Sequence, residues 1–176
     1  MSTNTATKSR RAAPSTPVAW LPRIGQLWPG QGIYAGIVRG EIGKPDHHLF
    51  LSEDDATSHA GVAWGGAGQD EPGAKSSLDG LANTRALVNS SHDHPAAEWA
   101  HSLNADGHRD WYLPSRRELR LCWVNAPQFF VSGWYWTSTQ YSPLNAWIQN
   151  FGGGSQYLYV KAYEARARAV RRFLIT

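Results

Sequence analysis

The stretch GHRDWYLPSRRELRLCW, residues 107–123, carries the clearest structural signals in the chain. Ser115 and Glu118 have the spacing of a capping box, in which each side chain satisfies a free backbone N–H group at a helix start. Apolar residues then recur every three or four positions until Pro127 ends the pattern. The sequence therefore predicts an amphipathic helix that begins after Ser115 and ends before Pro127.

The segments on either side predict further helices and several short strands. A helix is expected from Pro95 to near Gly107, and a shorter one over 83–89. Strands at 32–41 and 48–51 should form a hairpin, and the glycine-rich segment 52–80 should be a long loop. Short strands are expected after Pro127, at 135–139, 146–151, 156–159 and 165–173. This order of elements predicts an α+β domain.

The 176 residues fit one main domain whose core is aromatic. Nine tryptophans, in a chain that is 12% aromatic, supply the apolar area that scarce aliphatic residues do not. We expect Trp136, Phe151 and Cys122 to be buried. Residues 1–30 are expected to form a flexible N-terminal arm and docking segment, and residues 31–176 a ligand-binding domain.

The charge distribution argues against a nucleic-acid partner. The net charge of +3 equals the charge of Lys8, Arg10 and Arg11, so the rest of the chain is neutral overall. No apolar run approaches the roughly 18 residues of a membrane span or forms a signal peptide. We expect synthesis in the cytoplasm and no membrane insertion.

Catalytic and metal-binding patterns are weak. The pairs His47-His48 and His92-x-His94 lack a further ligand at a recognised metal spacing, so no metal and no cofactor is expected. No nucleophile elbow, zinc motif or phosphate loop occurs, so no catalytic residue is assigned. Glu118 is interpreted as a surface or capping residue. The alternating segment 164–169 should bury its alanines and expose Glu164, Arg166 and Arg168.

Residues 134–163 have the composition of a binding surface. Tyr and Trp are mixed with Ser, Thr, Asn and Gln, and Lys161 is the only formally charged residue of the segment. Aromatic rings give large rigid contacts and amides give adaptable hydrogen bonds. The alternative is that these aromatic residues only form the core.

The stretches 107–123, WYWTSTQYSPLNAWIQNFGGGSQ (134–156) and RARAVRRF (166–173) together resemble the C-type-lectin-like domains of phage tail-fibre and adhesin proteins, including relatives of retroelement-diversified variable proteins. Residues 21–40 also resemble the start of such phage proteins. The resemblance implies paired N- and C-terminal strands, with two main helices packed on small antiparallel sheets and long loops. It implies a displayed ligand-binding face formed by Gln140, Tyr141, Leu144, Asn145, Trp147, Gln149, Gln156, Tyr157 and Tyr159.

The resemblance also implies a function in the virion. The expected protein is a non-enzymatic tail-fibre tip or baseplate adhesin that binds a bacterial surface receptor, glycan or protein. Its arm would contact other tail or baseplate proteins, and the chain would form a homo-oligomer such as a trimer. One alternative is a virion assembly or decoration protein that binds another phage protein. Another is an enzyme of the formylglycine-generating type, which would need a reactive Cys122.

Overall fold

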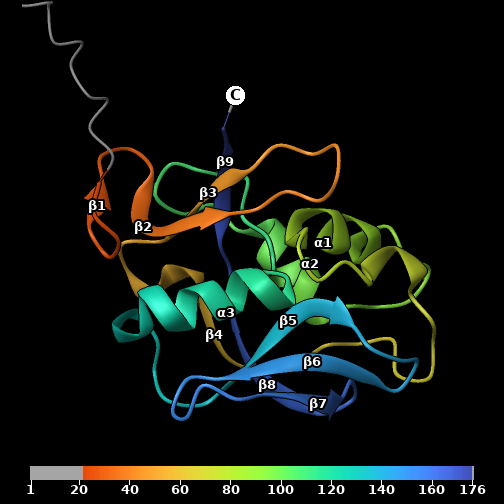
Figure 1. The fold of residues 1–176 in the computed structure, drawn as a ribbon. Coiled ribbons are helices and arrows are strands. Elements are labelled where there is room, and N and C mark those ends of the chain that lie inside the picture. The colour runs from red at the N-terminus through yellow and green to blue at the C-terminus, as the bar shows by residue number, and fades with distance from the viewer. Residues whose placement is uncertain (1–21, 176) are drawn as a thin grey trace, which may run out of the picture.

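The computed structural model describes residues 22–175 and contains two β-sheets and three α-helices (Figure 1). Helix α3 (Arg116–Asn125) lies between the sheets, against β2 of one and β5 and β6 of the other. The α+β class predicted from the sequence is confirmed. Most of the predicted arm falls in residues 1–21, outside the described part of the chain.

The first sheet has four strands in the order β1 (Leu27–Trp28), β2 (Gly32–Val38), β3 (His47–Leu51) and β9 (Arg171–Leu174). The predicted hairpin is confirmed, because β2 and β3 pair antiparallel. Strand β3 also pairs antiparallel with β9, so the last strand joins the sheet next to the hairpin rather than next to the first strand. The short strand β1 pairs with β2 and lies inside the predicted 1–30 segment.

The second sheet has five strands, in the order β4 (Ser58–Ala63), β8 (Glu164–Arg168), β5 (Trp134–Gln140), β6 (Asn145–Asn150) and β7 (Gln156–Val160). All pairs are antiparallel except β5 with β8. Strands β5, β6 and β7 lie close to their predicted positions.

Two sequence predictions about strands are wrong. The segment 52–80 is not a continuous loop, because it contains β4 and two 3₁₀ turns, at Asp55–Thr57 and Pro72–Ala74. The predicted strand 165–173 is two strands in different sheets, because the chain leaves β8 after Arg168 and Val170 pairs instead with Tyr112. The alternation of small and charged residues in the sequence gives no signal that the chain changes its pairing partner after Arg168.

The three helices are similar in length rather than two long and one short. Helix α1 is Gly80–Val88, α2 is Pro95–Ser102, and α3 has the predicted capping box between Ser115 and Glu118. In the described residues, no helix is long and apolar enough to cross a membrane.

The core is aromatic, as predicted. Trp64, Trp111 and Trp136 are fully buried, and each indole N–H donates to a backbone carbonyl oxygen at 2.8–3.1 Å. Cys122 and Phe151 are also buried. Arg168, expected on an exposed face, is buried and pairs with Asp55, so only part of the 164–169 pattern is as predicted.

Candidate functional site: an aromatic groove on the five-stranded sheet

The structure divides the nine predicted site residues into three groups. Gln140 and Gln149 are buried, so their side chains lie inside the protein and not on a displayed surface. Tyr157 and Tyr159 lie on one face of the β5–β6–β7 sheet. The remaining five lie at or near the other face: Tyr141, Leu144, Asn145, Trp147 and Gln156.

Strand register explains why the tyrosines of β7 and Trp147 point in opposite directions. Tyr157 pairs with Ile148, and Trp147 pairs with Leu158. Neighbouring residues of a strand point to opposite faces, so Tyr157 and Trp147 lie on different sides of the sheet. The residues of the predicted single face therefore form two separate surfaces.

The face that carries Tyr157 and Tyr159 is hollowed into an open groove of about 520 Å³, a volume in the range of small-molecule binding sites. Its floor and walls come from β4, β5, β6, β7 and β8. The lining residues are Ala60, Trp134, Ile148, Tyr157, Leu158, Tyr159, Glu164, Ala165 and Arg166. Tyr157 is 68% exposed, so its ring is available to a ligand.

Glu164 and Arg166 give the groove its polar character. Both line the groove and lie two positions apart on β8. Neither side chain has a hydrogen-bond or ion-pair partner among residues 22–175. An aromatic groove with a carboxylate and a guanidinium can bind a ligand that has an apolar surface and several hydrogen-bonding groups.

The site predicted from the sequence did not include four of the lining residues, Trp134, Ile148, Glu164 and Arg166. The alternation in 164–169 did indicate an exposed Glu164 and Arg166, and Trp134 is two positions before the buried Trp136. The missing information was the pairing of β5 with β8, which brings these residues beside β7.

On the opposite face, Arg116 and Trp147 form a packed pair. The guanidinium carbon of Arg116 lies 3.6 Å from the centre of the Trp147 ring. Its Nε donates to Gln156 Oε1 at 2.9 Å, and Gln156 Nε2 donates to the Arg116 carbonyl oxygen at 2.8 Å. Burial and the neighbouring Arg117 lower the pKa of Arg116 from its ordinary value. Trp147 and Gln156 are therefore already occupied by contacts within the chain.

Gln140 belongs to a buried network at the end of β5. Its Oε1 accepts hydrogen bonds from Lys161 Nζ at 2.6 Å and from the Glu71 backbone N–H at 2.9 Å. Its Nε2 donates to Asp70 Oδ1 at 2.6 Å. The side chain thus joins the loop before α1 to the turn after β7.

Glu71 holds the histidines that had suggested a metal. Its Oε1 is 3.0 Å from His92 Nδ1 and 3.0 Å from His94 Nε2, and it also accepts from Ser90. Burial alone would raise the pKa of Glu71, but these hydrogen bonds outweigh it and the pKa is lowered. Within the described ranges, no group of three or more His, Cys, Asp or Glu side chains is arranged to hold a metal ion.

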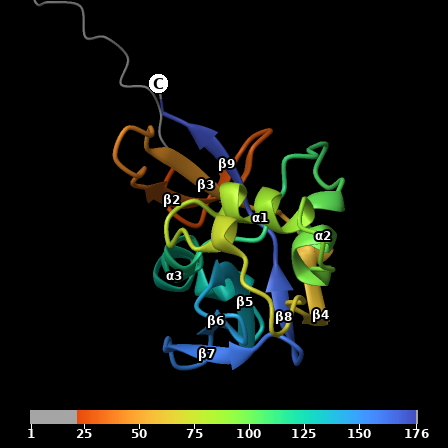
Figure 2. The same ribbon diagram turned by 90° about the vertical axis from the view of Figure 1, so that its right-hand side faces the viewer.

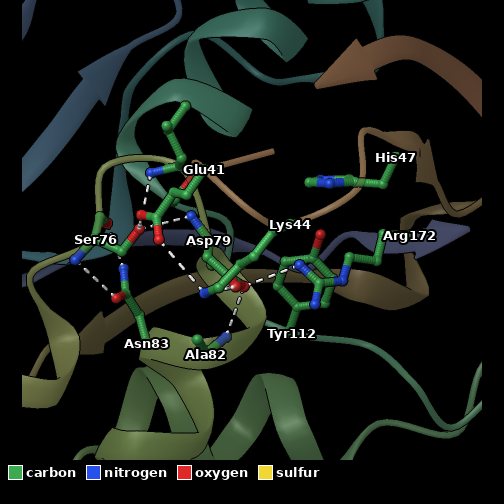
Figure 3. A network of polar contacts seen from close by, with 12 residues as sticks. Glu41, Lys44, His47, Ser76, Asp79, Ala82, Asn83, Tyr112 and Arg172 are labelled. Atoms are coloured by element: carbon green, nitrogen blue, oxygen red, sulfur yellow. Dashed lines mark hydrogen bonds and ion pairs between the residues drawn. The ribbon is translucent and has the colours of Figure 1, made fainter. Parts of the chain in front are cut away.

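A second polar network lies away from the groove, where the first sheet meets α1 (Figure 3). Asp79 caps α1 through the Ala82 N–H and pairs with Lys44 at 3.0 Å and Arg172 at 2.9 Å. Ser76 donates to Glu41 in the same network. The cavity that this network lines has a volume of only about 90 Å³, and the charged side chains of the network are paired with one another. Both observations indicate a structural role.

The family model described as "Lcl C-terminal domain" matches residues 57–171, which include all the strands and residues that line the groove. No curated protein matches the chain.

Proposed function

Because the chain belongs to the Lcl C-terminal domain family, we propose that it is an adhesin-type receptor-binding protein and that the aromatic groove binds the receptor. The family is of the binding, adhesin type and is not a known enzyme family, which supports a non-enzymatic role. The observation that carries the proposal is the open groove, in which Tyr157 is exposed and Glu164 and Arg166 have no ion-pair partner among residues 22–175.

The proposed setting is the phage tail. The motifs at 107–123, 134–156 and 166–173 resemble tail-fibre and adhesin domains, and the family match covers the same part of the chain. In this setting the protein is a tail-fibre tip or baseplate component that contacts a receptor on the bacterial surface. Several copies on one particle multiply weak contacts at single sites.

The test is binding of the purified protein to intact host bacteria. Tyr157→Ala on β7 and Trp134→Ala on β5 each remove an aromatic ring from the groove. Each substitution should abolish binding, and circular dichroism should show an unchanged fold. Tyr141→Ala is the matched control, because Tyr141 is 57% exposed and lies outside the groove. Wild-type protein that does not bind cells would contradict the proposal and favour a virion assembly role.

The predicted arm has a separate test. Deletion of residues 1–17 should leave a domain that still binds cells but no longer joins phage particles. Unchanged incorporation into particles would contradict the docking role of the arm.

A further inference from the structure

The two sheets have four outer strands in the described chain, and β7 differs from the other three. Sheet edges carry unpaired backbone groups and are usually protected by shortness, charge or a bulge. Strand β1 has only two residues, β9 begins with Arg171 and Arg172, and the register of β4 is interrupted between His59 and Val62. Strand β7 is QYLYV, with five residues in unbroken register, no charge and no proline. Figure 2 shows it at the outer margin of its sheet.

The hydrogen-bond pattern shows which groups of β7 face outward. The β6–β7 ladder is bounded by Asn150 N–H donating to the Ser155 carbonyl and Lys161 N–H donating to the Leu144 carbonyl. Because hydrogen-bonded pairs alternate along antiparallel strands, the odd-numbered residues of β7 bond to β6. The N–H and C=O groups of Gln156, Leu158 and Val160 therefore point away from the sheet. Among these groups, only the Val160 carbonyl has a partner in the described chain, the Tyr163 N–H.

The side chains of β7 are arranged symmetrically about Leu158. Tyrosines flank Leu158 on both sides, and uncharged Gln156 and Val160 follow at equal distance. A second copy of β7 could pair antiparallel with the first, with Leu158 opposite Leu158. The outward backbone groups of the two Leu158 residues would then bond to each other, and those of Gln156 would bond to those of Val160 in the other copy. Each Tyr157 would then lie opposite the Tyr159 of the other copy, in a non-hydrogen-bonded pair where side chains contact closely.

We propose that β7 pairs antiparallel with β7 of a second copy of this chain, and so joins two five-stranded sheets into one. The self-complementary pattern favours a second copy over an unrelated peptide, since one register satisfies the outward backbone groups and pairs aromatic with aromatic residues. No like charges meet in that register. The contact also brings two aromatic grooves side by side on a continuous sheet, which would let one dimer engage two receptor sites.

Cysteine cross-linking tests the register directly. In the proposed dimer the two Leu158 Cα atoms are about 5.5 Å apart, within the range that a disulfide spans. Leu158→Cys should therefore give a covalent dimer of the full chain under mild oxidation. Gln156→Cys is the matched control, because its Cα atoms would be about 13 Å apart. The native Cys122 is buried and should remain silent. Equal cross-linking of the two variants, or none at Leu158→Cys, would overturn the proposal.

Light scattering over a concentration series supplies a second test. Leu158→Pro should remain folded, since its N–H points away from β6 and proline is tolerated at such edge positions. The wild-type mass should rise toward a two-fold multiple with concentration, and Leu158→Pro should abolish this rise. An assembly formed elsewhere on the chain, such as the trimer expected for a fibre, would persist in both proteins. A wild type whose mass is unaffected by Leu158→Pro would overturn the proposal.

Discussion

The Nζ atom of Lys161 lies 2.6 Å from Oε1 of Gln140, and both side chains are buried. Lys161 also donates to the Gln69 carbonyl oxygen at 2.9 Å and lies 4.5 Å from the centre of the Trp64 ring. These contacts connect the loop before α1 to the five-stranded sheet that carries the groove. Because burial disfavours the charged form, the pKa of Lys161 falls from 10.5 to about 8.

Lys161 should make stability increase with pH in the alkaline range. Between about 8 and 10.5 the unfolded chain binds a proton at this side chain that the folded chain has released. The free energy of unfolding should therefore rise across this window, by about 3 kcal/mol at most. Lys161→Met should lack this rise. Urea denaturation of both proteins across the window measures the difference, and equal slopes would contradict the assignment.

Asp79 should make the stability of the fold depend on pH in the acidic range. Burial would raise its pKa, but the Ala82 N–H, Lys44 and Arg172 outweigh burial and lower the pKa below 3.8. Its stabilising contribution is therefore present above pH 3.8 and is lost as pH falls through the lowered value. Asp79→Asn keeps a capping side chain but removes the charge, and should cost about 1–3 kcal/mol at neutral pH. Acid titration monitored by fluorescence should show the wild type losing this advantage, whereas an unchanged gap would contradict the mechanism.

Glu118 should be among the most sensitive positions of the fold. Its Oε1 accepts from Tyr112 Oη at 2.8 Å and contacts His47 Nε2 at 3.0 Å. Its Oε2 accepts from the Ser115 N–H at 2.7 Å and the Gly80 N–H at 3.1 Å. Glu118→Gln replaces one acceptor oxygen by a donor in this buried site, and should cost about 3 kcal/mol or more.

The control for Glu118 is Glu98→Gln. The side chain of the exposed Glu98 accepts from the His94 N–H at the start of α2, where an amide oxygen can replace the carboxylate. Chemical denaturation should show a loss below about 1 kcal/mol for this variant. Similar losses for the two substitutions would mean that the buried contacts of Glu118 add little.

Local signals were predictable from the sequence, and distant contacts were not. The capping box depends on residues three positions apart, so its helix was predicted almost to the residue. The contact of Glu118 with His47 joins residues 71 positions apart and depends on how α3 packs on β3. The interpretation of Glu118 as a surface or capping residue was therefore half right, since it caps the helix but is fully buried.

The candidate site, too, was predictable from the sequence only in its local features. Composition indicated an aromatic, amide-rich surface in the correct segment, but it did not indicate which face each side chain takes. A shift of one residue in register reverses every side chain. The observed pairing of Trp147 with Leu158 places Trp147 beside Arg116 and leaves Tyr157 in the groove. Gln140 is polar, yet it is buried because Lys161 supplies its partner.

Cys122 should be unreactive in the folded protein. The thiol is fully buried in α3, and burial, together with the nearby Glu118 charge, raises its pKa well above the ordinary value. A thiol-specific reagent should therefore label none of the native protein and one thiol per chain in denaturant, as counted by mass spectrometry. Leu158→Cys is the positive control, because that position lies on the accessible edge of β7 and should label at once. Rapid labelling of native wild type would instead favour the enzyme alternative, which requires an accessible and ionisable Cys122.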